Sequence, residues 1–528
     1  MTGTLGPRNP SRLSIELRLV LWAPLILAAI LTAPDPDLFG RLVFAADALR
    51  NGLPEIDPYS FTSGDNPWIN HEWLAERIFY LTWWLGGIRL LTLLKASVLM
   101  GVFFFLVQGA ERRGVRPLTA RLLALATLPA IAFFSYVIRP GLFTVALTAL
   151  TCRILQEARE RPASLWGLVP VFGLWVNLHG GVVAGMAIFG LWWIAMLLID
   201  RRGQRGNWIR QTILPATASL AVLLVNPYGA ELPRFIVWAA TMPRPLITEW
   251  RSPIDDPYFM GVLLMILAPC AVAWLRTEQR RDGVELVLIL AAAGQALLHL
   301  RHIPLAAVVL YTFSAGHVDA VVGPLTQRLR GSLGARGWIP EPGPPAVWAR
   351  IGAWLVGLTI IALSLPHLNC WANPSIPYPL RATRIIRAAG FRGNMITPFN
   401  WGEFLINRLA PGVKVSLDAR YETVYSPALV DLHGRFFAGT DESLGLIRQY
   451  PVDAILLPVD YPVVARLRSD PDWVQVYEGG VAALFVSRER AAEWPRELPP
   501  IRRFDCRTLW HGYACFPEPL VLANRHDP

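Results

Sequence analysis

Two aspartates near the N-terminus stand where an apolar segment gives way to a polar one. Asp35 and Asp37 follow the apolar run 15–33 and precede residues 38–51, where apolar and polar residues recur at helical spacing. A carboxylate at such a boundary can accept a proton from a hydroxyl group, or bind a hard cation together with phosphate oxygens. Asp is also a favoured N-cap residue, so the simpler hypothesis is that both aspartates only cap the helix. We expect the chemical role at Asp37, with Asp35 as the alternative.

Further polar side chains close the same loop. His71 and Glu72 precede the next apolar run, and such a pair can act as acid and base or as metal ligands. Adjacent residues on a helix point in different directions, so we expect one of the two to anchor the loop at the membrane interface beside Trp68 and Trp73. Asp57 stands in the sequence Asp-Pro-Tyr-Ser and fits a turn as well as a binding site.

Polar residues also stand at the ends of apolar runs, where a bilayer makes them costly unless they face a polar cavity. An arginine there can bind a phosphate through two parallel hydrogen bonds, or it can simply extend to the interface. A carboxylate in a long loop can serve an acceptor or a metal, or lie in a solvated turn. An Asn-Leu-His-Gly-Gly sequence can form a site or break a helix. The candidate binding residues of this kind are Arg139, Asn177, His179, Glu249, Arg301 and His302.

Long apolar runs must position these residues. Hydrophobic residues make up 53% of the 528 residues, charged residues make up 17%, and the mean hydropathy is +0.38. A soluble domain carries about a quarter charged residues. Runs long enough to cross a bilayer recur to about residue 368, with 73–87 and 89–109 counted as separate spans. The sequence therefore predicts an α-helical polytopic membrane protein, with about 12 to 13 transmembrane helices in residues 1–368.

The charge pattern fits a membrane protein and argues against a nucleic-acid partner. The formal charge of +10 comes from 49 Lys and Arg against 39 Asp and Glu, and arginines gather between apolar segments, as at 111–121 and 200–210. Such clusters follow the positive-inside bias and are attracted to anionic headgroups. The five cysteines show no metal-finger spacing, although Cys506 and Cys515 could pair in an oxidising compartment.

The long polar stretches complete the predicted plan. Residues 34–72 form a first loop with an amphipathic helix along the membrane surface, and residues 227–258 form a second. Residues 369–528 carry more charge, and short strand-like segments alternate there with helical ones. They predict a C-terminal α/β domain of about 150 residues, which is large enough to fold alone. The strand-like segments are 414–417, 454–457 and 481–486.

The first loop resembles that of the GT-C superfamily, which includes the oligosaccharyltransferase catalytic subunit, protein O-mannosyltransferases and the lipid A aminoarabinose transferase. The resemblance rests on the acidic-Pro motif from Asp35 to Asp37, on Arg41 in the following helix, and on Gly52 and Asp57 after it. It implies transfer of a sugar from a polyprenyl-phosphate carrier to an acceptor outside the cytoplasm. It also implies that Asp37 activates the acceptor or holds a divalent cation, the one cofactor that we expect.

Two C-terminal segments, 400–405 and 415–421, resemble parts of the extracytoplasmic domains of other polytopic proteins of this type. In these domains a Trp-Gly pair precedes a strand that ends in Asp-x-Arg. We expect Asp418 and Arg420 to form an internal ion pair, and acceptor recognition is the alternative.

These predictions combine into one hypothesis, a glycosyltransferase of the bacterial cytoplasmic membrane with an extracytoplasmic C-terminal domain. Its first-loop carboxylates are expected to face the span-end Arg and His groups across a lipid-accessible cavity. The expected partners are the lipid bilayer, a polyprenyl-phosphate-linked sugar, and a glycan, lipid or protein acceptor. A transporter or flippase of a lipid-linked substrate would also need intramembrane Arg and His, and a non-catalytic envelope scaffold is the third alternative. The long acidic first loop favours the enzyme.

Overall fold

The computed structural model describes residues 15–492, apart from 34, 64–65, 201–202, 243–246, 336–346, 366–367, 369–370, 373–376 and 441–443, and also describes residues 494 and 515–516. The chain divides into two compact units. The helical unit comprises Met1–Thr32 and Thr92–His367. The α/β unit comprises Ala33–Leu91 and Leu368–Pro528, so it joins the first loop to the C-terminal part of the chain.

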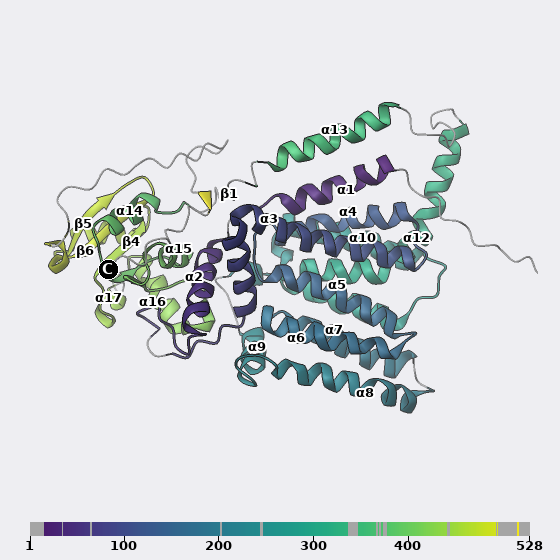
Figure 1. Cartoon of the computed structure of the whole chain (residues 1–528), viewed down its shortest axis with the longest axis horizontal. Coiled ribbons are helices and arrows are strands. Elements are labelled where there is room, and N and C mark those ends of the chain that lie inside the picture. The colour runs from purple at the N-terminus through teal and green to yellow at the C-terminus, as the bar shows by residue number, and fades with distance from the viewer. Residues whose placement is uncertain are drawn as a thin grey trace, which may run out of the picture. The chain divides into compact units, whose positions relative to one another are not determined.

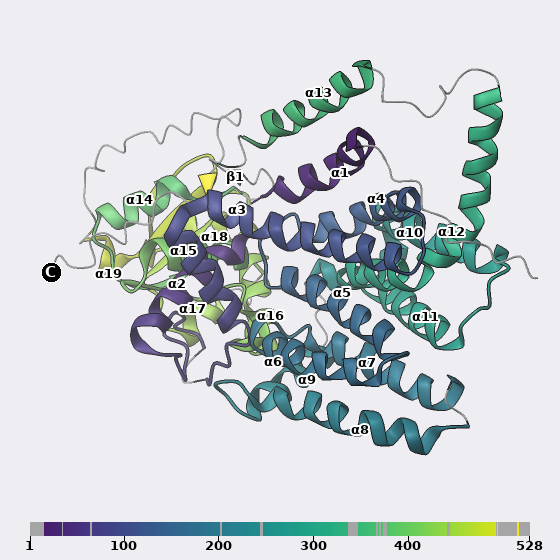
Figure 2. The ribbon, with the colours of Figure 1, turned by 45° about the vertical axis from the view of Figure 1, so that its right-hand side comes forward.

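Apolar helices packed side by side form the helical unit (Figure 1). Besides the second part of α3 (Trp73–Arg112), its helices are α1 (Ile15–Ile30), α4 (Pro117–Phe134), α5 (Gly141–Ala158), α6 (Leu168–Leu178), α7 (Val182–Ala195), α8 (Arg205–Ala221), α9 (Glu231–Thr241), α10 (Pro257–Arg276), α11 (Gly283–Leu298), α12 (Ile303–Ala335) and α13 (Val347–Ser364). The α12 helix packs against α4, α5, α10 and α11, as Figure 2 shows from a second direction. Its residues Ala307, Val308 and Leu310 are fully buried and belong to the core of this unit.

The composition of these helices confirms the predicted membrane protein. Within the described residues, five helices are long and apolar enough to cross a bilayer, namely Trp73–Arg112, Pro117–Phe134, Val182–Asp200, Pro257–Arg276 and Leu300–Leu325. Shorter apolar helices are Pro162–Leu178, Gly283–Leu298 and Arg350–Ser364. Large apolar side chains such as Leu275 and Trp354 are more than 70% exposed. Such surfaces require a lipid environment, since water would penalise them.

The predicted apolar segments 73–87 and 89–109 correspond to the two helical parts of α3, which are separated by a kink at Gly86 and Gly87. Gly87 has a φ of 59°, a conformation that glycine adopts without a steric penalty. The part before Thr92 belongs to the α/β unit, so this stretch contributes one span to the helical unit.

A five-stranded sheet organises the α/β unit, in the order β3-β2-β4-β6-β5. Its strands are β2 (Gly393–Ile396), β3 (Val413–Val415), β4 (Ala454–Pro458), β5 (Trp473–Glu478) and β6 (Ala482–Ser487), and β1 (Trp371–Ala372) pairs with β7 (Cys515–Phe516). Parallel pairing joins β2 to β3 and to β4, whereas β6 runs antiparallel to β4 and β5. The helices are α2 (Pro36–Asn51), α14 (Leu380–Ala388), α15 (Phe399–Leu409), α16 (Pro427–Phe437), α17 (Gly445–Gln449), α18 (Pro462–Ser469) and α19 (Arg488–Ala491). The predicted α/β class is confirmed, and β3, β4 and β6 overlap the predicted strands.

The amphipathic helix of the first loop is present as α2, but its apolar side faces protein. Leu38 and Leu42 are fully buried, and α2 packs against α15. Phe39 meets Phe404 edge to face, with ring centroids 5.2 Å apart, and its carbonyl accepts a 2.9 Å hydrogen bond from Asn407 Nδ2. The apolar side of α2 is therefore buried against α15.

The first loop also extends the sheet. Ser60 forms a parallel bridge with Val415, at the free edge of β3. Phe61 N donates to Val415 O at 3.2 Å, and Val415 N donates to Tyr59 O at 3.0 Å. These bonds satisfy backbone groups that an edge strand would otherwise expose. The C-terminal residues therefore complete their sheet with a segment of the first loop.

Candidate functional site

The two first-loop aspartates have different roles at the start of α2. Asp35 is the N-cap residue, and its Oδ1 accepts a 2.9 Å hydrogen bond from Asp37 N. Asp37 lies in the first turn, and its Oδ2 is 3.3 Å from Nη2 of Arg41, one helical turn further on. Asp35 is fully buried, whereas the Asp37 side chain is 24% exposed. The geometry thus gives the capping role to Asp35 and leaves Asp37 accessible.

Arg41 joins Asp37 to Glu72. Its Nε and Nη2 atoms lie 3.2 and 2.9 Å from the same oxygen, Oε2 of Glu72. Burial lowers the pKa of Arg41, but the charges of Glu72, Asp37, Asp35 and Glu403 outweigh that effect and raise it above its ordinary value. The guanidinium therefore stays charged, and its buried Nη1 has no hydrogen-bond partner among the described residues.

A fourth carboxylate reaches this cluster from the C-terminal part of the chain. Glu403, on α15, is 4% exposed and lies against Gly40 of α2. A Cβ atom at Gly40 would lie 2.5 Å from its Oε2. Burial raises the pKa of Glu403 well above its ordinary range, and the charge of Asp37 adds to this effect. Its Oε2 has no hydrogen-bond partner among the described residues, so Glu403 is a buried acid beside the accessible Asp37.

His71 and Glu72, the pair that closes the loop, make different contacts. Glu72 binds Arg41, and its backbone N donates to Asn70 Oδ1 at 3.1 Å. His71 stands at the side of the cluster, with its Nε2 3.8 Å from Oε1 of Glu72. Asn70 Nδ2 in turn donates to Glu76 Oε2 at 2.6 Å. Glu72 is therefore the member of the pair that belongs to the Asp37 cluster, which we define as Asp35, Asp37, Arg41, Glu72 and Glu403.

The Asp37 cluster does not fit a metal ion. A divalent cation such as Mg²⁺ needs several oxygen ligands that converge on one point. Here Oδ2 of Asp37 and Oε2 of Glu72 converge on the Arg41 guanidinium. Within the described residues, no group of three His, Cys, Asp or Glu side chains has the arrangement that could hold a metal. The donor set supplies acid–base and hydrogen-bonding chemistry.

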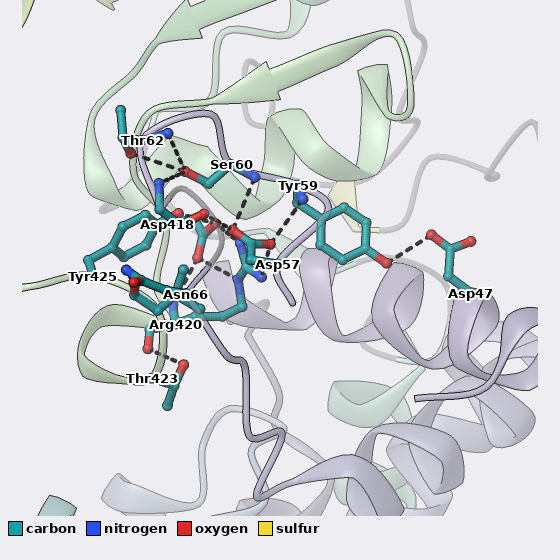
Figure 3. A network of polar contacts seen from close by, with 12 residues as sticks. Asp47, Asp57, Tyr59, Ser60, Thr62, Asn66, Asp418, Arg420, Thr423 and Tyr425 are labelled. Carbon is teal, nitrogen blue, oxygen red and sulfur yellow. Dashed lines mark hydrogen bonds and ion pairs between the residues drawn. The ribbon is translucent and has the colours of Figure 1, made fainter. Parts of the chain in front are cut away.

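Asp57 belongs to a buried polar network in the same unit (Figure 3). It accepts hydrogen bonds from Tyr59 N, Ser60 N and Ser63 Oγ, and its Oδ1 lies 2.6 Å from Nη1 of Arg420. Asp418 Oδ2 lies 2.6 Å from Nη2 of the same arginine. The predicted internal ion pair of Asp418 and Arg420 is confirmed, and it includes Asp57. These contacts favour the turn interpretation of Asp57.

Aromatic rings enclose the same arginine. The guanidinium carbon of Arg420 is 4.7 Å from the ring centroid of Trp68, 5.0 Å from that of Phe44 and 5.4 Å from that of Tyr59. Burial lowers the pKa of Arg420, but Asp418 and Asp57 outweigh this effect and raise it well above its ordinary value. Arg420 thus fastens the first loop to the sheet.

In the helical unit, two of the predicted span-end residues form an ion pair. Arg139, just before α5, pairs with Glu249 through its Nη1. Glu249 lies in the short helical turn Thr248–Trp250 of the second long loop. Both side chains are about 35% exposed, at 36% and 35%. This arrangement brings the second-loop carboxylate next to a span-end cation.

Two other span-end residues, Arg301 and His302, lie around Trp250. The guanidinium carbon of Arg301 lies 4.8 Å from the Trp250 ring centroid, and the His302 ring centroid is 6.4 Å from it. His299 Nδ1 is 2.8 Å from Trp250 O, and Leu300 N donates to Arg251 O at 2.9 Å. The second loop and the turn before α12 therefore form one group of cationic and aromatic side chains.

Asn177 and His179 serve local structure at the end of α6. Asn177 Nδ2 donates to Gly173 O at 2.8 Å and to Val225 O at 2.9 Å. His179 Nδ1 is 2.8 Å from Thr144 Oγ1 and accepts a 3.1 Å bond from Gly181 N. Because Nδ1 accepts, Nε2 carries the proton of the neutral imidazole.

Sequence reasoning missed Arg41, Glu403 and Trp250 as members of these groups. Arg41 had a local signal, since it stands four residues after Asp37 on the predicted helix. Glu403 had none, because its approach to Gly40 depends on the packing of α15 against α2. Trp250 stands next to the predicted Glu249 but carries no charge that would mark it.

No protein-family model and no curated protein matches the sequence. Solved structures do match. The archaeal oligosaccharyltransferase AglB from Archaeoglobus fulgidus, in complex with an inhibitory peptide and a dolichol-phosphate, superposes with a TM-score of 0.57 at 11% identity, over 90% of this chain and 74% of that chain. ArnT from Cupriavidus metallidurans in the apo state superposes with a TM-score of 0.53 at 12% identity, over 91% of this chain and 99% of that chain. ArnT bound to undecaprenyl phosphate superposes with a TM-score of 0.50 at 12% identity, over 89% of this chain and 97% of that chain.

The chain has a GT-C-like fold. The superpositions cover most of both chains, so the GT-C-like plan extends from the apolar helices to the C-terminal sheet. The sequence resemblance to the GT-C superfamily is confirmed at the level of the fold.

Proposed function

We propose that this protein transfers a sugar from a polyprenyl-phosphate carrier to an acceptor hydroxyl. The observation that carries the proposal is the accessible carboxylate of Asp37, held at the start of α2 by Arg41 beside Glu72. Two proteins with the same fold, AglB and ArnT, have been solved with dolichol-phosphate and undecaprenyl phosphate, respectively. A carboxylate placed next to a lipid-linked donor supplies the base that glycosyl transfer requires.

The proposed reaction needs a base and a site for the departing phosphate. Asp37 accepts the proton of the acceptor hydroxyl as its oxygen bonds to the anomeric carbon of the sugar. The bond from that carbon to the carrier phosphate oxygen breaks, and the phosphate leaves with the bonding electrons. In the helical unit, Arg301 and Arg139 stay predicted ligands of a carrier phosphate, because guanidinium groups match phosphate oxygens, and His302 stays a predicted binding residue. The acceptor is a glycan, lipid or protein hydroxyl.

The α/β unit is placed outside the cytoplasm in this proposal. Residues 111–121 are rich in arginine, and the positive-inside bias assigns them to the cytoplasm. With the single span contributed by α3, the first loop then lies on the opposite side, where a bacterial cytoplasmic membrane presents lipid-linked sugars to extracytoplasmic acceptors. The C-terminal residues are assigned to the same side of the membrane as the first loop, since both belong to one unit.

Asp37→Asn tests the proposed base, with Asp35→Asn as the matched control. Both changes keep the side-chain shape and the capping capacity, since Asn and Asp cap helices about equally well. Loss of a general base typically lowers a rate by about 10²- to 10⁴-fold. We expect Asp37→Asn to abolish, and Asp35→Asn to preserve, the envelope glycan that distinguishes wild type from a deletion strain by mass spectrometry. Full restoration of that glycan by Asp37→Asn would refute the assignment of Asp37 as base.

A further inference from the structure

The Arg41 guanidinium occupies the place between Asp37 and Glu72. Its Nη2 is 3.3 Å from Oδ2 of Asp37 and 2.9 Å from Oε2 of Glu72, and its Nε is 3.2 Å from the latter oxygen. A cation shared by these two oxygens would have to displace the guanidinium. The side chains of Arg41 and Glu72 are only 12% and 14% exposed, so displacement would break a mostly buried ion pair.

Electrostatic attraction keeps the Arg41 guanidinium between Asp37 and Glu72. The carboxylates of Asp35, Asp37 and Glu72 lie around one guanidinium, and together they hold the pKa of Arg41 above its ordinary value. Arginine does not lose its proton in proteins, so the positive charge cannot be titrated away. Charged hydrogen bonds to carboxylates are among the stronger ones in proteins, and an incoming metal ion would have to replace the guanidinium at both Asp37 and Glu72.

We infer that Arg41 takes the structural and electrostatic place of a divalent cation, so that the Asp37 cluster binds no metal in the wild-type protein. The inference concerns the site of the proposed function, but it makes a separate statement about ion binding. Asp37 can be the base with or without a metal beside it. A wrong inference here would therefore leave the proposed transfer intact.

Binding of Mn²⁺ to the full-length protein in detergent tests the inference. The electron paramagnetic resonance signal of free Mn²⁺ measures how much ion the protein removes from solution. The reference for non-specific binding is the triple variant Arg41→Gln, Asp37→Asn, Glu72→Gln, which lacks the guanidinium and the two carboxylates that it joins. We expect wild type to bind no more Mn²⁺ than this reference.

Arg41→Gln provides the complementary measurement. It removes the guanidinium and leaves the carboxylates of Asp37 and Glu72 without their shared cation. We expect this variant to bind one Mn²⁺ that the triple variant does not bind, at least about tenfold more tightly than wild type, which corresponds to 1.4 kcal/mol. A folded Arg41→Gln protein that gains no Mn²⁺ site would overturn the inference.

If Arg41→Gln does not fold, Mn²⁺ binding to wild type decides the inference. One equivalent of Mn²⁺ bound by wild type and lost in Asp37→Asn would show that a metal coexists with Arg41, and the inference would be wrong. The glycan measurement on Asp37→Asn in the deletion strain then decides the proposed function separately.

Discussion

At the scale of single residues, the position of an arginine determines what it does. Within the described residues, Arg41 has one buried nitrogen without a hydrogen-bond partner, next to an accessible carboxylate. Arg420 is 8% exposed, and two carboxylates and three aromatic rings surround its guanidinium. The first therefore belongs to a candidate site, whereas the second holds two segments of the chain together.

Arg420→Met tests the structural role of the buried ion pairs. The variant keeps apolar bulk but leaves the carboxylates of Asp57 and Asp418 buried without their cation. Loss of one partner from a buried pair typically costs about 3–5 kcal/mol, so we expect a loss of that size in the free energy of unfolding. Chemical denaturation of the full-length protein in detergent, followed by tryptophan fluorescence, measures it.

Arg468→Met is the matched control for this change. Arg468 pairs with Glu478 at 2.8 Å in the same unit, but the two side chains are 43% and 45% exposed. Water screens such a pair, so its loss should leave the free energy of unfolding unchanged. Equal destabilisation by Arg420→Met and Arg468→Met would contradict the role assigned to Arg420.

At the scale of elements, helix α2 connects the candidate base to the rest of the α/β unit. Asp35 caps its first turn, Asp37 and Arg41 lie on one side of it, and Gly40 faces α15. The absence of a side chain at Gly40 lets Glu403 approach the helix backbone. The position of Asp37 therefore depends on how α15 packs against α2.

Gly40→Ala tests this dependence. The new Cβ would lie 2.5 Å from Oε2 of Glu403, which is closer than atoms approach without a shift. Overpacking of a buried contact typically costs about 1–3 kcal/mol, and this exceeds the helix propensity gained from alanine. We therefore expect Gly40→Ala to lower thermal stability.

Two further variants identify the cause of that loss. Glu403→Ala in the Gly40→Ala background should restore stability, since it removes the atoms that clash. Gly434→Ala, at an exposed position of α16 with no atom near the added Cβ, should be neutral or slightly stabilising. Destabilisation by Gly434→Ala to the same extent would show that the contact with Glu403 is not the reason.

At the scale of the whole molecule, the composition of the two units constrains topology. Residues 33–91 and 368–528 form one unit, so they lie on the same side of the membrane. The chain between them must therefore cross the bilayer an even number of times. With the predicted span at 15–33 added, the total is odd, as an extracytoplasmic C-terminal domain requires when the N-terminus is cytoplasmic.

Cysteine labelling tests this topology. In a variant whose five native cysteines are replaced by serine, a single cysteine at the exposed Glu55 or Asp431 should react with a membrane-impermeant maleimide in intact spheroplasts. A cysteine at the exposed Glu278, after α10, should react only after permeabilisation. Opposite labelling of Glu55→Cys and Asp431→Cys would contradict the common unit.

The sequence by itself determined the features that depend on local periodicity and composition. Apolar runs predicted the membrane helices, and apolar residues at helical spacing predicted the amphipathic helix at 38–51. Charge together with short strand-like segments predicted the C-terminal α/β class. Each of these follows from burial of one side of an element, which leaves a repeating pattern in the residues. The first-loop motif gave the GT-C-like fold by resemblance.

Only the tertiary structure decided which residues meet. It placed Glu403 against Gly40, joined Arg420 to Asp57, and set the Arg139 and Glu249 side chains together. It also showed that a kink at Gly86 and Gly87 joins the predicted segments 73–87 and 89–109. The physical reason is that a hydrophobic pattern specifies which side of an element is buried, whereas the choice of partner depends on shape and charge brought together by the folded chain.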